Sequence, residues 1–231
     1  MNTSLVAALS CGLLCGAAAA GTLQVSVTDK DGAPVPDVVV LVEPQAKVAP
    51  KPAAAPVVIT QRDLRFAPFL TIVPVGSTLR FVNEDGYDHH VRSTPSGPLG
   101  SMPAVKNFEL RLDAAVAAAA PVNDEYKTSA PRKKSGATTA DVKVDQAGPI
   151  GLGCHIHSSM RGQVYVSGTP WFAKTDANGM ATMEGVPDGA ADLSIWHPDQ
   201  LQEQPTQHLQ VTAAPLKASG QLNFTPRRRK S

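Results

Sequence analysis

A short segment of the chain carries three side chains that bind transition metals. Cys154, His157 and Met160 follow one another in the spacing C-x2-H-x2-M, between two apolar segments. Thiolate, imidazole and thioether are soft or borderline ligands, and this set favours copper over magnesium or calcium. Zinc also binds cysteine and histidine, but Met160 favours copper over zinc because zinc sites are built from thiolate, imidazole and carboxylate.

A copper site of this composition needs one further histidine, and the sequence offers two. In the blue-copper arrangement, two histidines and one cysteine surround the ion and a methionine binds weakly along the axis. His89 and His90 follow a strand-like segment at 79–83. Adjacent residues of a strand point to opposite faces, so one of the pair would face the other ligands. We expect the side chain of His155 to point to the opposite face, without a metal role.

The cysteine content fits a protected thiol. Cys11 and Cys15 lie in the N-terminal segment, and Cys154 is the third cysteine of the chain. If the N-terminal segment is removed, Cys154 has no partner for an internal disulfide. A free thiol is an oxidation hazard outside the cytoplasm, and binding to a metal would protect it.

Residues 1–20 have the features of a signal peptide. A short apolar run ends in four alanines at 17–20, where small residues suit signal peptidase. The run is interrupted by Ser10 and Gly12, and it is shorter than the roughly 20 apolar residues of a membrane-spanning helix. We expect export to the periplasm with cleavage near Ala20, and no membrane span.

Alternating apolar residues between turn signals predict an all-β chain. The 231 residues include 20 prolines and 18 glycines, which favours turns over long helices. Segments 22–28 and 38–42 flank a turn cluster and predict a β-hairpin over 22–43. Residues 113–147 are rich in alanine and lysine and lack a strand pattern, which predicts a flexible insertion. Further strand-like segments lie at 57–60, 69–73, 79–82, 108–112, 149–152, 163–166, 171–174, 180–183, 192–196, 207–211 and 221–224.

Composition and motifs argue against several other functions. Lys and Arg (21) nearly balance Asp and Glu (20), so the chain lacks the basic field of a nucleic-acid-binding protein. The sequence has neither a phosphate-binding glycine loop nor a Gly-x-Ser-x-Gly motif, and no carboxylate pair suggests acid–base catalysis. We therefore expect a protein that is not an enzyme. The basic tail at 226–231 is either a solvated terminus or a docking patch for an acidic partner.

The metal-binding segments resemble those of the cupredoxins. The C-x2-H-x2-M loop resembles the short ligand loop of the amicyanin and plastocyanin type, and 76–85 followed by 88–91 is similar to that family's strand and His-Asn-Val pattern. The resemblance implies a Greek-key β-sandwich over 57–168 and one type 1 copper ion held by His89, Cys154, His157 and Met160. It also implies that His157 serves as the electron port. His90 stands where the family usually has an asparagine that ties the ligand strand to the cysteine loop.

A second resemblance flanks the first. Segments 25–38, 174–179 and 185–189 resemble a carboxypeptidase regulatory-like, or transthyretin-like, β-sandwich. This implies a small sandwich split into 21–50 and 169–225, with the cupredoxin inserted into it or packed on it. The combination is similar to the plastocyanin-like methylamine utilization proteins.

The implied function is transfer of single electrons between protein redox partners. The alternative is a periplasmic copper carrier or sensor without an electron-transfer role.

Overall fold

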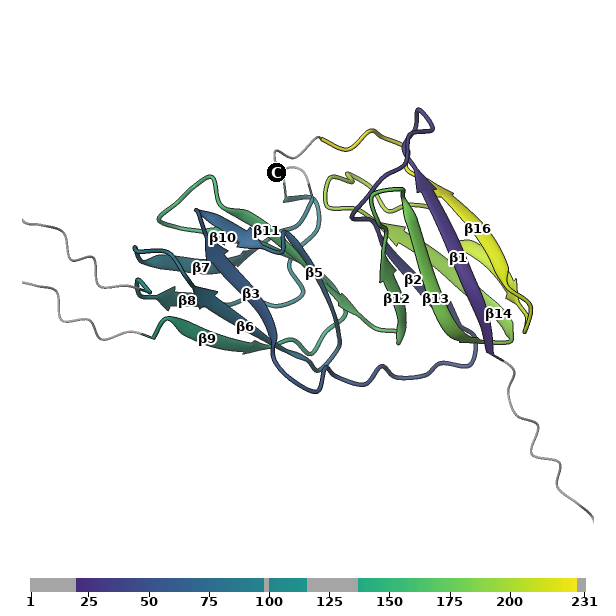
Figure 1. Cartoon of the computed structure of the whole chain (residues 1–231), viewed down its shortest axis with the longest axis horizontal. Helices are drawn as coiled ribbons and strands as arrows, with labels where there is room; N and C mark the ends of the chain where they lie inside the picture. Colours follow the sequence, from purple (N-terminus) through teal and green to yellow (C-terminus); the bar gives the residue numbers. More distant parts are fainter. Residues whose placement is uncertain (1–19, 98–99, 116–136, 228–231) are drawn as a thin grey trace, which may run out of the picture.

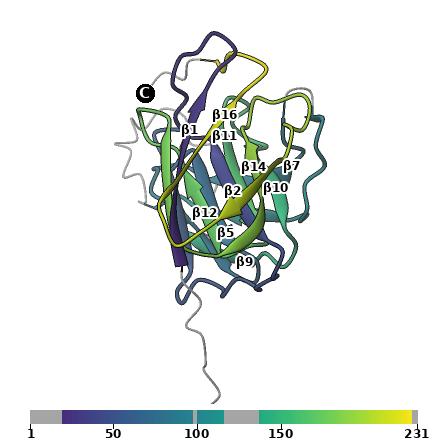
Figure 2. The same ribbon diagram turned by 90° about the vertical axis from the view of Figure 1, so that its right-hand side faces the viewer.

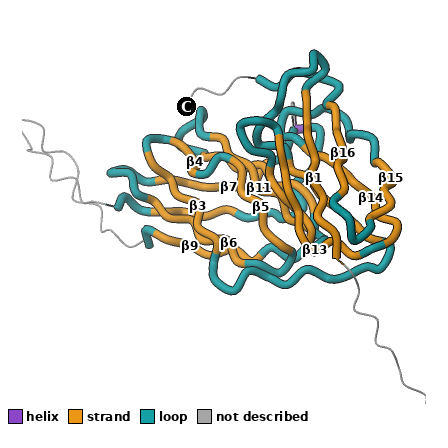
Figure 3. Tube along the Cα trace, turned by 45° about the vertical axis from the view of Figure 1, so that its right-hand side comes forward, coloured by secondary structure: helices purple, strands orange, loops and turns teal. Residues whose placement is uncertain are grey.

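The computed structural model describes residues 20–97, 100–115 and 137–227. These residues form sixteen β-strands in four sheets and no α-helix, which confirms the predicted all-β class (Figures 1 and 3). Within the described ranges, no helix has the length and apolarity needed to cross a membrane. The predicted signal peptide lies outside the described residues except for Ala20, where the first strand begins.

The described residues between 57 and 167 form one β-sandwich, which we call the central sandwich. Its sheets have the strand orders β4-β3-β6-β9 and β5-β11-β10-β7-β8, and they enclose a cluster of buried apolar side chains. Two pairs, β3 with β6 and β5 with β11, are parallel. The strands are β3 (Val57–Arg62), β4 (Arg65–Ala67), β5 (Leu70–Pro74), β6 (Thr78–Asn83), β7 (His89–Thr94), β8 (Glu109–Leu112), β9 (Thr139–Lys143), β10 (Gly148–Cys154) and β11 (Arg161–Ser167).

The segments on either side of the central sandwich in the sequence form a second sandwich, the split sandwich. Its sheets have the orders β13-β1-β16 and β12-β2-β14-β15, and they enclose a separate apolar cluster. The strands are β1 (Ala20–Thr28), β2 (Val39–Pro44), β12 (Trp171–Lys174), β13 (Met180–Pro187), β14 (Gly189–Trp196), β15 (Gln207–Val211) and β16 (Leu216–Gln221).

The predicted hairpin over 22–43 is wrong. β1 pairs with β13 and β16, whereas β2 pairs with β12 and β14, so the two strands lie in opposite sheets of the split sandwich. The reason lies in the unbroken apolar run at 38–42. Val40 and Val42 face the core shared with β1, while Val39 and Leu41 are buried on the other face. A strand that is apolar on both faces belongs inside the molecule, between two layers.

The outer face of β2 packs against the central sandwich. Val39 and Leu41 meet Leu70 of β5 and Trp196 of β14, and we call this group the joint cluster. The indole nitrogen of Trp196 donates to the sulfur of Met102 at 3.4 Å. The four sheets therefore stack in a row, with β1 and β16 in the foreground of Figure 2 and β5 and β11 behind β2 and β12.

The predicted flexible insertion at 113–147 is wrong at its C-terminal end. Residues 139–143 form β9, which pairs with β6 along the edge of the central sandwich. Val142 and Val144 alternate with polar residues and are buried, a pattern that the neighbouring lysines obscure in the sequence. Residues 116–136 lie outside the described residues.

Candidate metal centre

Two neighbouring strands and one loop bring the predicted ligands to the same end of the central sandwich. His89 is the first residue of β7 and Cys154 the last of β10. The two strands are antiparallel, and Cys154 lies opposite Val91, so the start of one strand lies beside the end of the other. The loop after Cys154 turns tightly, because the Met160 amide donates to the carbonyl of His157 at 3.0 Å.

Three donor atoms converge at this end of the sandwich. Cys154 Sγ lies 3.8 Å from His89 Nδ1 and 3.7 Å from His157 Nδ1, and the two Nδ1 atoms are 3.1 Å apart. His89 is fully buried, Cys154 is 3% exposed, and His157 is partly exposed. Cys154 is a free thiol. The structure thus brings together three of the four residues that the resemblance implied.

The spacing of these atoms fits one metal ion. Bonds of a first-row divalent ion are about 2.05 Å to imidazole nitrogen and about 2.3 Å to thiolate sulfur. An ion bound by three donors in a plane separates nitrogen from sulfur by about 3.8 Å and nitrogen from nitrogen by about 3.5 Å. The nitrogen–sulfur separations match, and the nitrogen–nitrogen separation is slightly shorter. Two imidazoles with one thiolate form a donor set that suits copper.

Met160 lies at the far end of the ligand loop. Its side chain is 1% exposed and belongs to the same buried cluster as Cys154. This position is compatible with a weak fourth ligand, and the axial role of Met160 stays a prediction.

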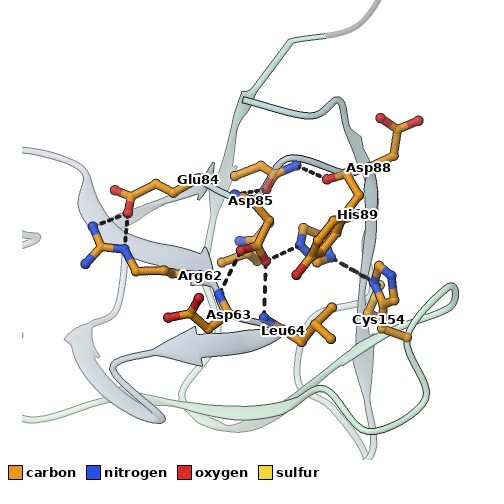
Figure 4. A network of polar contacts seen from close by, with 12 residues as sticks. Arg62, Asp63, Leu64, Glu84, Asp85, Asp88, His89 and Cys154 are labelled. Atoms are coloured by element: carbon orange, nitrogen blue, oxygen red, sulfur yellow. Dashed lines mark hydrogen bonds and ion pairs between the residues drawn. The ribbon is translucent and has the colours of Figure 1, made fainter. Parts of the chain in front are cut away.

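A buried carboxylate holds the ring of His89. Asp85 Oδ2 lies 2.8 Å from His89 Nε2, and the same carboxylate accepts the backbone amides of Asp63 at 2.7 Å and Leu64 at 3.2 Å (Figure 4). Because the Nε2–H donates to the carboxylate, the lone pair of Nδ1 points toward Cys154 and His157. Asp85 is not among the site residues predicted from the sequence, although an acidic residue four positions before a candidate histidine ligand was a usable signal.

Hydrogen bonds stabilise the ionised form of the buried Asp85 carboxyl. Burial alone would raise the pKa of this carboxyl, but the hydrogen bonds from His89 and from the amides of Leu64 and Asp63 outweigh burial and hold the pKa below its usual value. Burial lowers the pKa of His157, and the nearby His89 lowers it further. A neutral His157 keeps its Nδ1 lone pair available for a metal.

His90 and His155 face away from the converging donors. The ring of His90 lies 2.9 Å from Glu109 Oε1 and that of His155 lies 3.0 Å from the same atom. The expected direction of the His155 side chain is confirmed. The backbone joins the two segments, since the His90 amide donates to Cys154 Sγ at 3.4 Å and the His155 amide donates to the carbonyl of His90 at 3.0 Å.

Apolar side chains surround the exposed edge of the centre. Tyr87 packs edge-on against both rings, with centroids 5.6 Å from His89 and 5.4 Å from His157. Leu64, Tyr87 and Ile156 are 38%, 43% and 53% exposed. This end of the molecule therefore presents an apolar rim around a partly exposed histidine.

Comparison with known proteins gives likenesses to solved structures alone. No family model and no curated protein matches the chain. A copper-containing nitrite reductase from Thermus scotoductus is 20% identical over 54% of this chain and 25% of its own, with a TM-score of 0.34. The chain thus spans about a quarter of that enzyme's length.

Smaller copper proteins are similar at the same level. A purple cupredoxin from Nitrosopumilus maritimus is 17% identical over 48% of this chain and 99% of its own, with a TM-score of 0.32. The Cu(I) form of an amicyanin variant is 18% identical over 55% of this chain and 98% of its own, with a TM-score of 0.33. We infer the chemistry of the site from its own donor atoms.

Proposed function

We propose that the chain is an exported type 1 copper protein of the cupredoxin kind that carries single electrons between protein partners. The observation that supports this most is the convergence of Cys154 Sγ with the Nδ1 atoms of His89 and His157 at 3.1–3.8 Å in a buried position. Thiolate and imidazole stabilise both common oxidation states of copper. The bound ion would supply the capacity to take up one electron and to release it.

The residues around the donors keep the centre rigid. β7 and β10 fix His89 and Cys154 through backbone pairing, and Asp85 fixes the orientation of the His89 ring. The amide of His90 donates to the sulfur of Cys154 and withdraws electron density from it. A ligand set that hardly moves between oxidation states lowers the barrier to electron transfer, because no groups need to be rearranged.

The apolar rim is the proposed docking face for redox partners. His157 is the ligand nearest the surface, and Leu64, Tyr87 and Ile156 offer apolar area around it. A small apolar face suits brief contacts that exclude water and separate again. Ser158 and Ser159 make one side of this face polar. In this proposal the chain has no enzymatic activity of its own.

Two parts of the sequence-based hypothesis remain predictions. Removal of residues 1–20 would leave Gly21 at the start of the mature chain, with β1 otherwise intact. The regulatory-like sandwich would act as a scaffold that carries the copper domain. Mass determination of the secreted protein tests the first of these.

The visible spectrum of the copper-loaded protein tests the proposal. We expect an intense blue or green absorption in the oxidised state, because this colour arises from copper bound to thiolate. Cys154→Ser should abolish the band while far-ultraviolet circular dichroism retains the β signal. Ser158→Ala, in the same loop but without a donor role, is the matched control and should keep the band.

Two results would reject the electron-carrier proposal. One is a band that persists in Cys154→Ser, because the thiolate would then not be the source of the colour. The other is loss of copper during a cycle of reduction and reoxidation, which is the behaviour of a carrier that delivers its ion.

A further inference from the structure

A second cluster of metal-binding side chains lies on the outer face of the central sandwich. His90 Nε2 and His155 Nε2 both lie within 3.0 Å of Glu109 Oε1, and the two imidazole rings are 4.9 Å apart between centroids. The side chains of His90, His155 and Glu109 are 34%, 43% and 56% exposed. Two imidazoles and a carboxylate therefore converge at the surface, open to solvent.

Strand geometry accounts for the position of this cluster. Neighbouring residues of a strand project to opposite faces, so the residues that follow His89 and Cys154 point outward if those two point inward. His90 follows His89 on β7, and His155 follows Cys154 at the end of β10. The backbone bond from the His155 amide to the His90 carbonyl at 3.0 Å keeps the two outward residues side by side. Glu109 reaches them from β8, the neighbour of β7.

We propose that His90, His155 and Glu109 form a second metal site, which binds a divalent transition-metal ion such as Cu²⁺ or Zn²⁺. Imidazole and carboxylate suit these ions. The cluster lacks sulfur, so it favours Cu(II) over Cu(I), in contrast to the thiolate centre on the inner face. Three protein donors on an exposed surface leave further coordination positions for water.

The contacts within the cluster show how an ion would enter. Each imidazole contacts the same carboxylate oxygen through Nε2, so the two rings lie on either side of Glu109 and would close around an ion that binds between them. For an ion to bind, each Nε2 must offer its lone pair, so its proton would move to Nδ1 in a neutral ring or leave altogether in a protonated one.

Two arginines set an upper limit on the affinity. In the β7–β8 register, Arg111 lies opposite His90 and Arg92 lies opposite Glu109. Their positive charges oppose a divalent cation, and solvent screens this repulsion only in part. We therefore expect the outer site to bind more weakly than the buried centre and to strengthen with added salt.

Metal stoichiometry of the full chain tests this proposal. At saturating Cu²⁺, equilibrium dialysis should give two ions per chain, and electron paramagnetic resonance should show the second ion as an ordinary tetragonal Cu(II) species. His155→Ala and Glu109→Gln should each lower the affinity for the second ion by about tenfold or more. Loss of a residue that only contacts a metal ligand already lowers metal affinity by about that factor. Neither change should alter the visible band of the buried centre.

The control is the other exposed histidine–carboxylate pair. His208 Nδ1 lies 2.7 Å from Asp192 Oδ1, with His208 86% exposed, and within the described ranges this pair belongs to no group of three metal-binding side chains. His208→Ala should keep both ions. Binding of one ion by the unmodified chain, or an unchanged second ion in both His155→Ala and Glu109→Gln, would overturn the proposal. The test does not depend on the buried centre. If the copper-loaded protein is colourless, the buried-centre proposal fails, but loss of one ion in His155→Ala still supports the outer site.

Discussion

Each sandwich buries an aspartate that accepts two backbone amides, and the two aspartates differ in what else they contact. In the split sandwich, Asp29 is 5% exposed and accepts the amides of Asp31 and Ala33, both at 2.9 Å. In the central sandwich, Asp85 is 7% exposed and also accepts two amides, but its second oxygen in addition lies 2.8 Å from the ring of His89. The same residue type thus closes a turn in one sandwich and orients a candidate metal ligand in the other.

Other buried polar groups follow this division. In the split sandwich, the hydroxyl of Thr175 accepts the amide of Val38 and donates to the carbonyl of Val35, so it serves the backbone alone. In the central sandwich, the donors of His89 and Cys154 point at one another and at a third side chain. A buried polar group that bonds to the backbone supports the fold. A group of buried polar atoms that converge on one point indicates a binding site.

The largest effect on stability is expected at the joint cluster, where the sandwiches meet. Trp196 is 4% exposed, and its ring lies 5.1 Å from that of Tyr165 in the central sandwich. Trp196→Ala should lower the free energy of unfolding by about 3–5 kcal/mol, as for other large aromatic residues removed from a core. Chemical denaturation followed by circular dichroism measures this change, and the copper spectrum of the folded variant should be unchanged.

Trp171→Ala is the matched control for the joint. Trp171 packs on the core of the split sandwich, away from the joint cluster, and is only partly buried. Its removal should destabilise the chain less than removal of Trp196. A changed copper spectrum in Trp196→Ala would contradict the idea that the split sandwich only supports the fold while the central sandwich alone shapes the metal centre.

Effects of intermediate size are expected at the two buried aspartates, which can be compared directly. In Asp85→Asn and in Asp29→Asn, an amide nitrogen replaces one acceptor oxygen, and each should cost about 1–3 kcal/mol of stability for a stranded buried donor. Asp85→Asn alone should also weaken Cu²⁺ binding by about 10–100-fold, the usual cost of losing a partner of a metal-bound histidine. It should raise the reduction potential, because loss of the negative charge disfavours Cu(II) more than Cu(I).

Voltammetry and copper competition titrations of the two variants separate these effects. An unchanged potential in Asp85→Asn would mean that this carboxylate only closes a turn, as Asp29 does. A potential that shifted equally in Asp29→Asn would show that the effect does not depend on contact with His89.

The sequence predicted strands better than it predicted their partners. Alternation correctly identified β1 and β2, but alternation describes the two faces of a strand and not its neighbours. β1 and β2 lie close in the sequence and yet in opposite sheets, because the partners of both come from beyond residue 170. β9 was missed since its short alternation lies next to a stretch of lysines and alanines.

The sequence predicted the ligands in the loop of the candidate site, but not the residues that surround these ligands. Cys154 and His157 follow from spacing alone. The choice between His89 and His90 depends on which face of β7 turns inward, and pairing with β10 decides this. Asp85 resembles any aspartate in a turn until the fold places it against His89. A residue that contacts a metal ligand, as Asp85 contacts His89, is brought there by tertiary contacts, which no local sequence pattern encodes.

The smallest expected effect concerns a third carboxylate, that of Asp176, which lies on the surface and accepts backbone amides. Asp176 Oδ1 accepts the amides of Asn178 at 2.8 Å and Met180 at 2.9 Å, and these hydrogen bonds hold the pKa of the Asp176 carboxyl below its usual value. A group whose pKa is lower in the folded chain stabilises it above the unfolded pKa, and this contribution disappears as the pH falls through the folded pKa. Asp176→Ala should therefore lower the melting temperature slightly at neutral pH and by less in strong acid.

Melting curves in the metal-free Cys154→Ser background isolate this effect, since no copper then contributes to stability. Asp176→Asn keeps a side-chain oxygen as acceptor without the charge, so its small difference from the parent should likewise shrink in acid while its difference from Asp176→Ala stays constant with pH. A parent-to-alanine difference of equal size above and below the folded pKa of Asp176 would show that the charge contributes nothing to stability. Because Asp176 bonds within its own turn, to backbone amides and to the side chain of Asn178, titrating it should leave the donors of the central sandwich unaffected, as expected of a carboxylate that supports the fold.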